Sequence, residues 1–120
     1  MAFTIAVDFD GTLSSYEQGF IGPDVFGQPI MPVVESLQLL KRMGWKIIIF
    51  TCREKSEGMI KWLKEHEVPF DEINENSDNP KGTSPKPFAH VYLDDRALNY
   101  GGQDAHTLMD QIFKLMEEEH

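Results

Sequence analysis

The sequence has little cysteine and no long hydrophobic run. Cys52 is the one cysteine among 120 residues, so the chain can form neither an internal disulfide nor a cysteine-based zinc site. No stretch reaches the ~18 consecutive apolar residues of a membrane span. The N-terminus also lacks a basic region followed by an apolar segment, which argues against a signal peptide. We therefore expect a cytoplasmic protein without a membrane partner.

Basic residues are scarce as well. Eleven Lys and Arg against 20 Asp and Glu give a formal net charge of −9. So acidic a chain is a poor electrostatic match for nucleic acid or an anionic membrane, although a few local cations can still bind one phosphate. A length of 120 residues predicts a single domain.

Short apolar runs alternate with segments of helical periodicity. Four buried strands are predicted at residues 4–7, 46–51, 70–73 and 89–93. Three helices are predicted over residues 32–43, 55–66 and 104–117. The last helix is expected to face the core through Leu108, Ile112, Phe113 and Met116. This alternation predicts an α/β fold: a three-layer, Rossmann-like parallel sheet with helices on both faces.

Polar residues follow three of the four predicted strands. The segments are Asp8-Phe9-Asp10-Gly11-Thr12, Thr51-Cys52-Arg53 and Asp94-Asp95-Arg96. The carboxyl ends of parallel strands share one edge of the sheet, so the four aspartates should meet there. Their mutual repulsion requires a cation, and oxygen ligands without histidine favour Mg²⁺ over zinc.

The spacing of the first two aspartates has a chemical meaning. Residues two apart in an extended strand point to the same side, so Asp8 and Asp10 could both face one phosphorus atom. One carboxylate would attack while the other handles protons. Gly11 would allow backbone amides to approach a phosphate closely.

These segments resemble the motifs of the haloacid dehalogenase (HAD) superfamily of phosphohydrolases. The first segment, continued by Leu13, resembles motif one, and the apolar run ending at Thr51 resembles motif two. Lys86 resembles the motif-three lysine, and Tyr92-Leu93-Asp94-Asp95 resembles motif four. The resemblance covers roughly residues 4 to 96 and agrees with the predicted fold.

The resemblance implies a role for each matching residue. Asp8 would be the nucleophile that forms an aspartyl-phosphate, and Asp10 the general acid and base. Thr51 would hold the phosphoryl group, and Lys86 would neutralise it, although Lys81 in the same loop is the other candidate for that role. Mg²⁺ would be held by Asp8, the backbone carbonyl of Asp10, Asp94 and, directly or through water, Asp95.

Other residues beside these motifs are candidates for substrate binding. They are Gly11, Thr12, Cys52 and Arg53. For Arg53 the alternative is a surface salt bridge with Glu54 or Glu57, and Cys52 is expected to be a small buried residue. Arg96 is expected to be structural.

The gaps between the motifs leave no room for a cap domain. A helix or two and a strand consume them, so residues 1–120 are expected to be one capless HAD-like core with residues 14–31 as a flap. An open site fits a macromolecular phosphate end, or a phosphorylated small molecule if a homo-oligomer covers the site.

Two alternatives belong to other functional classes. A response-regulator receiver also has acidic residues, a threonine and a lysine, but its acid pair follows the first strand, whereas here the pair follows the fourth. A catalytically degenerate, HAD-like phosphate-binding or regulatory protein would keep the fold without turnover. The sequence favours a magnesium-dependent phosphatase over both.

Overall fold

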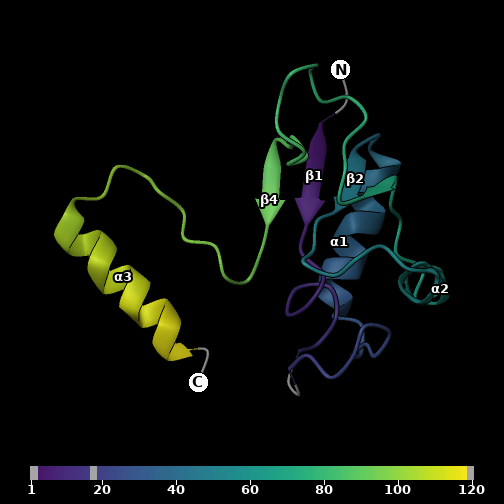
Figure 1. The fold of residues 1–120 in the computed structure, drawn as a ribbon, viewed down its shortest axis with the longest axis horizontal. Coiled ribbons are helices and arrows are strands. Elements are labelled where there is room, and N and C mark those ends of the chain that lie inside the picture. The colour runs from purple at the N-terminus through teal and green to yellow at the C-terminus, as the bar shows by residue number, and fades with distance from the viewer. Residues whose placement is uncertain (1–2, 17–18, 119–120) are drawn as a thin grey trace.

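The fold is built on a parallel sheet of four strands, as predicted. A computed structural model describes residues 3–16 and 19–118. The strands are β1 (Thr4–Val7), β2 (Lys46–Ile49), β3 (Glu72–Ile73) and β4 (Val91–Leu93), arranged in the order β3-β2-β1-β4. Every neighbouring pair is parallel, so all four carboxyl ends lie at one edge (Figure 1). The α/β fold class is therefore confirmed.

Two helices connect the first three strands, and local sequence sets where each begins. Helix α1 (Met31–Arg42) has a proline in its first turn, where the missing N–H costs no hydrogen bond. Helix α2 (Glu57–Glu65) starts after Ser56, whose hydroxyl accepts a hydrogen bond from Met59 N at 3.1 Å.

Both helices pack on the same face of the sheet. Ile5 and Val7 of β1 and Ile47 and Ile49 of β2 form one core cluster with side chains of α1 and α2. The helices contribute Val34, Leu37, Met59, Trp62 and Leu63. Alternate strand residues point to opposite faces, so these inward positions follow directly from the pattern of the strands.

The opposite face has a smaller core. Ala6 and Ile48 cluster there with Ala89, and Phe50 packs against them. Residues 74–90 cross this face between β3 and β4, and Asn76 fixes them by donating a hydrogen bond to the Phe88 carbonyl at 2.9 Å. Within the described residues, this loop rather than a helix covers the second face, so the predicted helical layer on that face is absent in a single chain.

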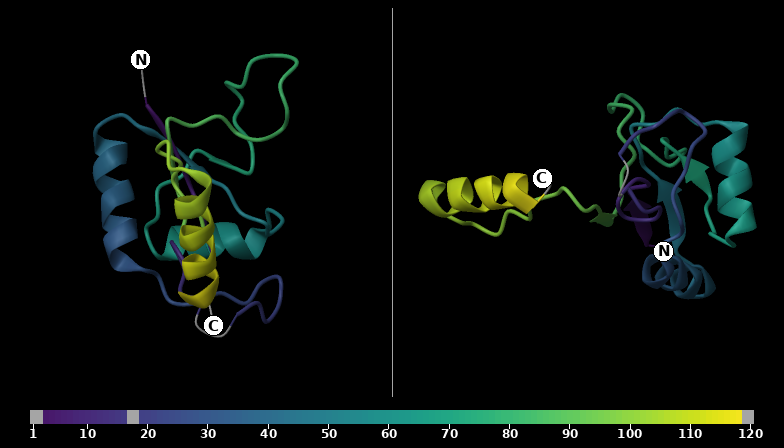
Figure 2. Two further views of the ribbon diagram at one scale, coloured as in Figure 1. Left: turned by 90° about the vertical axis from the view of Figure 1, so that its left-hand side faces the viewer. Right: turned by 90° about the horizontal axis from the view of Figure 1, so that it is seen from below.

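The third helix, α3 (Ala105–Glu118), stands apart from the sheet (Figures 1 and 2). Ile112, Phe113 and Met116 are 41%, 53% and 55% exposed, so the prediction that they face the core is wrong within a single chain. Residues 94–104 carry the helix away from β4 instead of folding it back. The radius of gyration is 15.5 Å, against about 13.6 Å for a compact domain of this length.

Among the residues that the structure describes, no helix has the length and apolar character to cross a bilayer.

Candidate active site

Three aspartates meet at the carboxyl edge of the sheet. Asp8 follows β1, and Asp94 and Asp95 follow the neighbouring strand β4. The Asp8 amide donates to the Leu93 carbonyl at 2.9 Å, which extends the strand pairing up to the site. One carboxylate oxygen from each aspartate lies within 4.8 Å of the others. This group can hold a metal ion.

The electrostatics of the cluster are unbalanced in the protein alone. Burial, the charge of Asp94 and a hydrogen bond shared with Asp95 raise the pKa of Asp8 from 3.8 to about 7. The carboxylates of Asp94 and Asp95 disfavour a negative charge on the partly buried Asp8, which explains why its pKa is raised. A hard cation bound by oxygen ligands would offset that repulsion, so the donor set fits a divalent metal.

A tight turn shapes the loop after the nucleophile candidate. The Gly11 amide donates to the Ser14 carbonyl at 2.8 Å, and Gly11 has a φ of 86°. A side chain at position 11 would collide with the Asp95 carboxylate. Thr12, buried beside the turn, donates its hydroxyl to Asp95 Oδ1 at 3.4 Å. Glycine is therefore required both for the turn and for the approach of Asp95.

Asp10 is held by Arg53 rather than by the metal-binding group. Arg53 Nε donates to Asp10 Oδ2 at 2.8 Å, and its Nη2 donates to Oδ1 at 3.0 Å. This fork is bidentate, and the Arg53 side chain is only 5% exposed. The alternative of a surface salt bridge with Glu54 or Glu57 is wrong, because Arg53 points inward to Asp10.

Arg53 also ties down the flap. Its remaining N–H groups donate to the carbonyls of Gly22, Pro23 and Val25 at 3.0–3.1 Å. The guanidinium carbon lies 5.0 Å from the ring centres of both Phe20 and Phe26. One buried cation therefore fixes the flap and Asp10 together.

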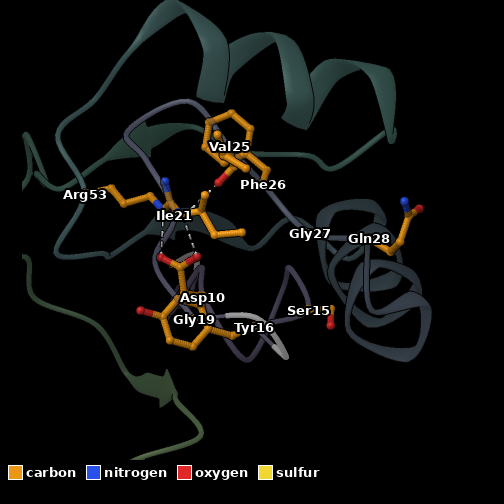
Figure 3. Close-up of a pocket in the computed structure, with 10 residues that line it drawn as sticks. All are labelled: Asp10, Ser15, Tyr16, Gly19, Ile21, Val25, Phe26, Gly27, Gln28 and Arg53. Atoms are coloured by element: carbon orange, nitrogen blue, oxygen red, sulfur yellow. Dashed lines mark hydrogen bonds and ion pairs between the residues drawn. The ribbon is translucent and has the colours of Figure 1, made fainter.

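Two cavities lie beside this ion pair. One of about 280 Å³ opens between Asp10, Arg53 and the flap (Figure 3). A second, of about 480 Å³, is lined by Asp10 and Arg53 together with Tyr16, Phe20 and residues 54–56 just before α2. Cys52 also lines the second cavity and is exposed, so the expectation that it is buried is wrong. Both cavities reach Asp10.

Thr51 lies at the end of β2 in a network that includes an unpredicted residue. The Thr51 hydroxyl accepts a hydrogen bond from Arg53 N at 3.1 Å, and the Thr51 amide donates to Asn74 Oδ1 at 2.8 Å. Asn74 also donates to the Arg53 carbonyl at 2.9 Å and has a φ of 59°. Asparagine adopts this left-handed conformation more readily than most residues. An asparagine directly after a predicted strand was therefore the sequence feature that could have pointed to Asn74.

Lys86 does not lie against Asp8 in this structure. Its ammonium sits 4.9 Å from the ring centre of Tyr92. Lys81 is exposed in the same loop. Neither lysine is brought to the aspartate group, so the motif-three assignment remains a prediction that requires this loop to move.

Comparisons with known proteins show the fold more clearly than the function. No family model matches the sequence, and no curated protein matches it. Among solved structures, a conserved protein from Bacteroides thetaiotaomicron is 29% identical with a TM-score of 0.64, and the match covers all of this chain and 93% of that one. A protein from Vibrio cholerae is 25% identical with a TM-score of 0.52 over the full length of both.

A larger assembly is also similar in fold. A chain of the Pnkp1/Rnl/Hen1 RNA repair complex has a TM-score of 0.59 at 21% identity, and the match covers 98% of this chain but 40% of that one. At this identity the likeness establishes a shared α/β fold. This chain thus corresponds to less than half of a longer protein in that complex.

Proposed function

We propose that this protein is a magnesium-dependent phosphohydrolase that cleaves a phosphomonoester through an aspartyl-phosphate on Asp8. The observation that carries the proposal is the group of Asp8, Asp94 and Asp95, whose oxygens lie within 4.8 Å at the carboxyl edge of a parallel sheet. The resemblance of the sequence to HAD phosphohydrolases and the shared fold with a chain of an RNA repair complex support it.

The metal would be held by Asp8 and Asp94, with Asp95 beside them and the backbone carbonyl of Asp10 as a further oxygen donor. When bound, Mg²⁺ supplies positive charge that offsets the carboxylates and the phosphate oxygens. This charge is needed because Asp8 is an anion that must approach another anion.

The reaction would proceed in two balanced steps. In the first step, an Asp8 carboxylate oxygen bonds to phosphorus while the bond to the leaving oxygen breaks, and Asp10 gives its proton to that oxygen. In the second step, Asp10 takes a proton from water, the water oxygen bonds to phosphorus, and the bond to Asp8 breaks. Inorganic phosphate leaves, and both aspartates return to their starting states.

The Arg53 fork bears on the proton transfers of Asp10. With both carboxylate oxygens accepting from Arg53 at 2.8 and 3.0 Å, neither is free to carry a proton toward a leaving group. We infer that one oxygen of Asp10 turns away from Arg53 when substrate binds. The 480 Å³ cavity beside Asp10 is the place where the leaving group would lie, and its volume suits a small molecule or one end of a polymer.

A non-catalytic function remains the second candidate, and the position of Lys86 favours it. A protein whose lysine stays over Tyr92 would lack one cation for the transferring phosphoryl group. Such a protein would bind phosphate or a phosphorylated ligand at the same sheet edge without turning it over.

Hydrolysis of p-nitrophenyl phosphate distinguishes the two. We expect turnover with Mg²⁺, no turnover after chelation, and no turnover in Asp8→Asn. Glu35→Gln, which neutralises one exposed carboxylate on α1, is the matched control and should retain full activity. Full activity in Asp8→Asn would refute the mechanism, and phosphate binding without turnover in the unaltered protein would favour the second candidate.

A further inference from the structure

We propose that two copies of this chain exchange their C-terminal arms, so that α3 of one copy packs on strand β4 of the other. The arm is defined as residues 96–118, which comprise a linker and α3. This inference concerns an interaction surface and is independent of the proposed function. It rests on two bare apolar surfaces in one chain and on the path of the linker between them.

The first bare surface is the apolar stripe of α3. Met109, Ile112, Phe113 and Met116 are between 41% and 55% exposed, and none of the helix positions whose burial is described is buried. These residues recur at three- and four-residue spacing, which places them on one side of the helix. A helix of 14 residues is only marginally stable alone in water, so its formation requires a partner surface.

The second bare surface is strand β4, at the edge of the sheet. Val91 and Leu93 pair in register with Ile5 and Val7. They therefore point to the face on which α1 and α2 pack against β1 and β2. They are 43% and 37% exposed, whereas Ile5 and Val7 are buried. The helical layer therefore leaves the β4 side chains on this face uncovered within one chain.

The linker leads α3 away from its own β4. Arg96 lies at its start, with its guanidinium carbon 5.7 Å from the ring centre of Tyr16 in the flap. Further along, Gln103 Nε2 donates to the Asn99 carbonyl and to Gln111 Oε1, both at 2.9 Å, which fixes the end of the linker against α3. The arm extends away from the sheet, as Figures 1 and 2 show.

A second copy satisfies both surfaces at once. Each chain carries one helix stripe and one bare strand, so a two-fold exchange is closed and leaves neither exposed. Four side chains of α3, together with Val91 and Leu93 of β4, lose roughly 80–100 Å² each if their exposed halves are covered, with ~200 Å² for a large side chain. Two such contacts bury on the order of 1,000 Å², which is about the smallest area expected of a specific interface.

The oligomeric state of matched variants tests the proposal. Light scattering after size exclusion should give a dimer for the unaltered protein and a monomer for Phe113→Glu. Lys114→Glu adds the same residue at the next position, away from the apolar stripe, and should remain a dimer. Since each dimer contains two altered arms, we expect the dissociation constant to rise roughly a hundredfold at about tenfold per arm. A monomeric unaltered protein, or a Phe113→Glu dimer of unchanged affinity, would overturn the proposal.

Disulfide trapping then identifies which surfaces meet. Leu93→Cys and Ile112→Cys, each combined with Cys52→Ser, are mixed under denaturant, refolded together and oxidised. The exchange predicts a crosslink between the two different variants, which a monomer with its own α3 folded back cannot form. If the double variant Leu93→Cys/Ile112→Cys instead closes within one chain at monomer mass, the occupant of β4 is the chain's own helix and the proposal is wrong.

Discussion

Removing the charge of Asp8 should stabilise the metal-free protein at neutral to alkaline pH. The pKa of Asp8 is raised from 3.8 to about 7 by burial and by the neighbouring aspartates. The folded state therefore holds this proton more tightly than the unfolded state does, and its stability falls as the pH rises from about 4 to 7. Above pH 7 the full cost of ionising Asp8 in the folded protein is present, and Asp8→Asn removes it.

The size of the effect follows from the shift. A rise from 3.8 to about 7 corresponds to roughly 4 kcal/mol at 1.36 kcal/mol per pKa unit. Because Asp94 and Asp95 are exposed and water screens their charges, we expect a gain on the order of 1–3 kcal/mol for Asp8→Asn at pH 8. At pH 5.5, inside the window between the two pKa values, the gain should be about half as large.

Urea unfolding followed by circular dichroism measures this gain. It is recorded in EDTA at pH 8 and pH 5.5 for the unaltered protein, Asp8→Asn and the control Glu35→Gln, which should change little at either pH. Added Mg²⁺ should stabilise the unaltered protein and have much less effect on Asp8→Asn. Unfolding of Asp8→Asn at equal or lower urea concentration than the unaltered protein in EDTA at pH 8 would refute the electrostatic reasoning.

Three further predictions test other parts of the site. Arg53→Lys should lower kcat and should cost roughly 2–3 kcal/mol of stability, because a single ammonium cannot replace the bidentate fork to Asp10 and the flap carbonyls; an unchanged urea midpoint would contradict this. Gly11→Ala should abolish activity and destabilise the protein by about 1–3 kcal/mol, since it has a φ of 86° and faces the Asp95 carboxylate; wild-type activity would show that the turn is not required. Asp94→Asn should weaken Mg²⁺ binding at least ~10-fold in calorimetry, and an unchanged affinity would place the metal elsewhere.

The order of elements and the site edge were predictable because local sequence determines them. The strands predicted at 4–7 and 46–51 pair in the sheet, although the second ends at Ile49, and helix α1 was predicted to within one residue at each end. Parallel strands with polar residues at their carboxyl ends must bring Asp8 and Asp94 together, whatever the loops do. This part of the candidate site follows from topology alone.

Contacts that depend on loops or on a partner were not predictable in the same way. The Arg53 fork joins residues 43 positions apart through the conformation of the flap, and nothing in local periodicity specifies it. The exposure of Cys52 and the position of Lys86 over Tyr92 likewise depend on the conformations that the long loops adopt. Three of the four stripe residues of α3, Ile112, Phe113 and Met116, were predicted, but an apolar stripe does not specify whether the surface that covers it belongs to the same chain.

The central claim is that Asp8 carries the phosphoryl group, and trapping that adduct tests it most directly. The protein is mixed with p-nitrophenyl phosphate and Mg²⁺, quenched in acid during turnover, digested and analysed by mass spectrometry. We predict one added phosphoryl group on the peptide that contains Asp8, absent in Asp8→Asn and absent after chelation. Steady turnover with no phosphoryl group on that peptide, or with the group on another residue, would contradict the account.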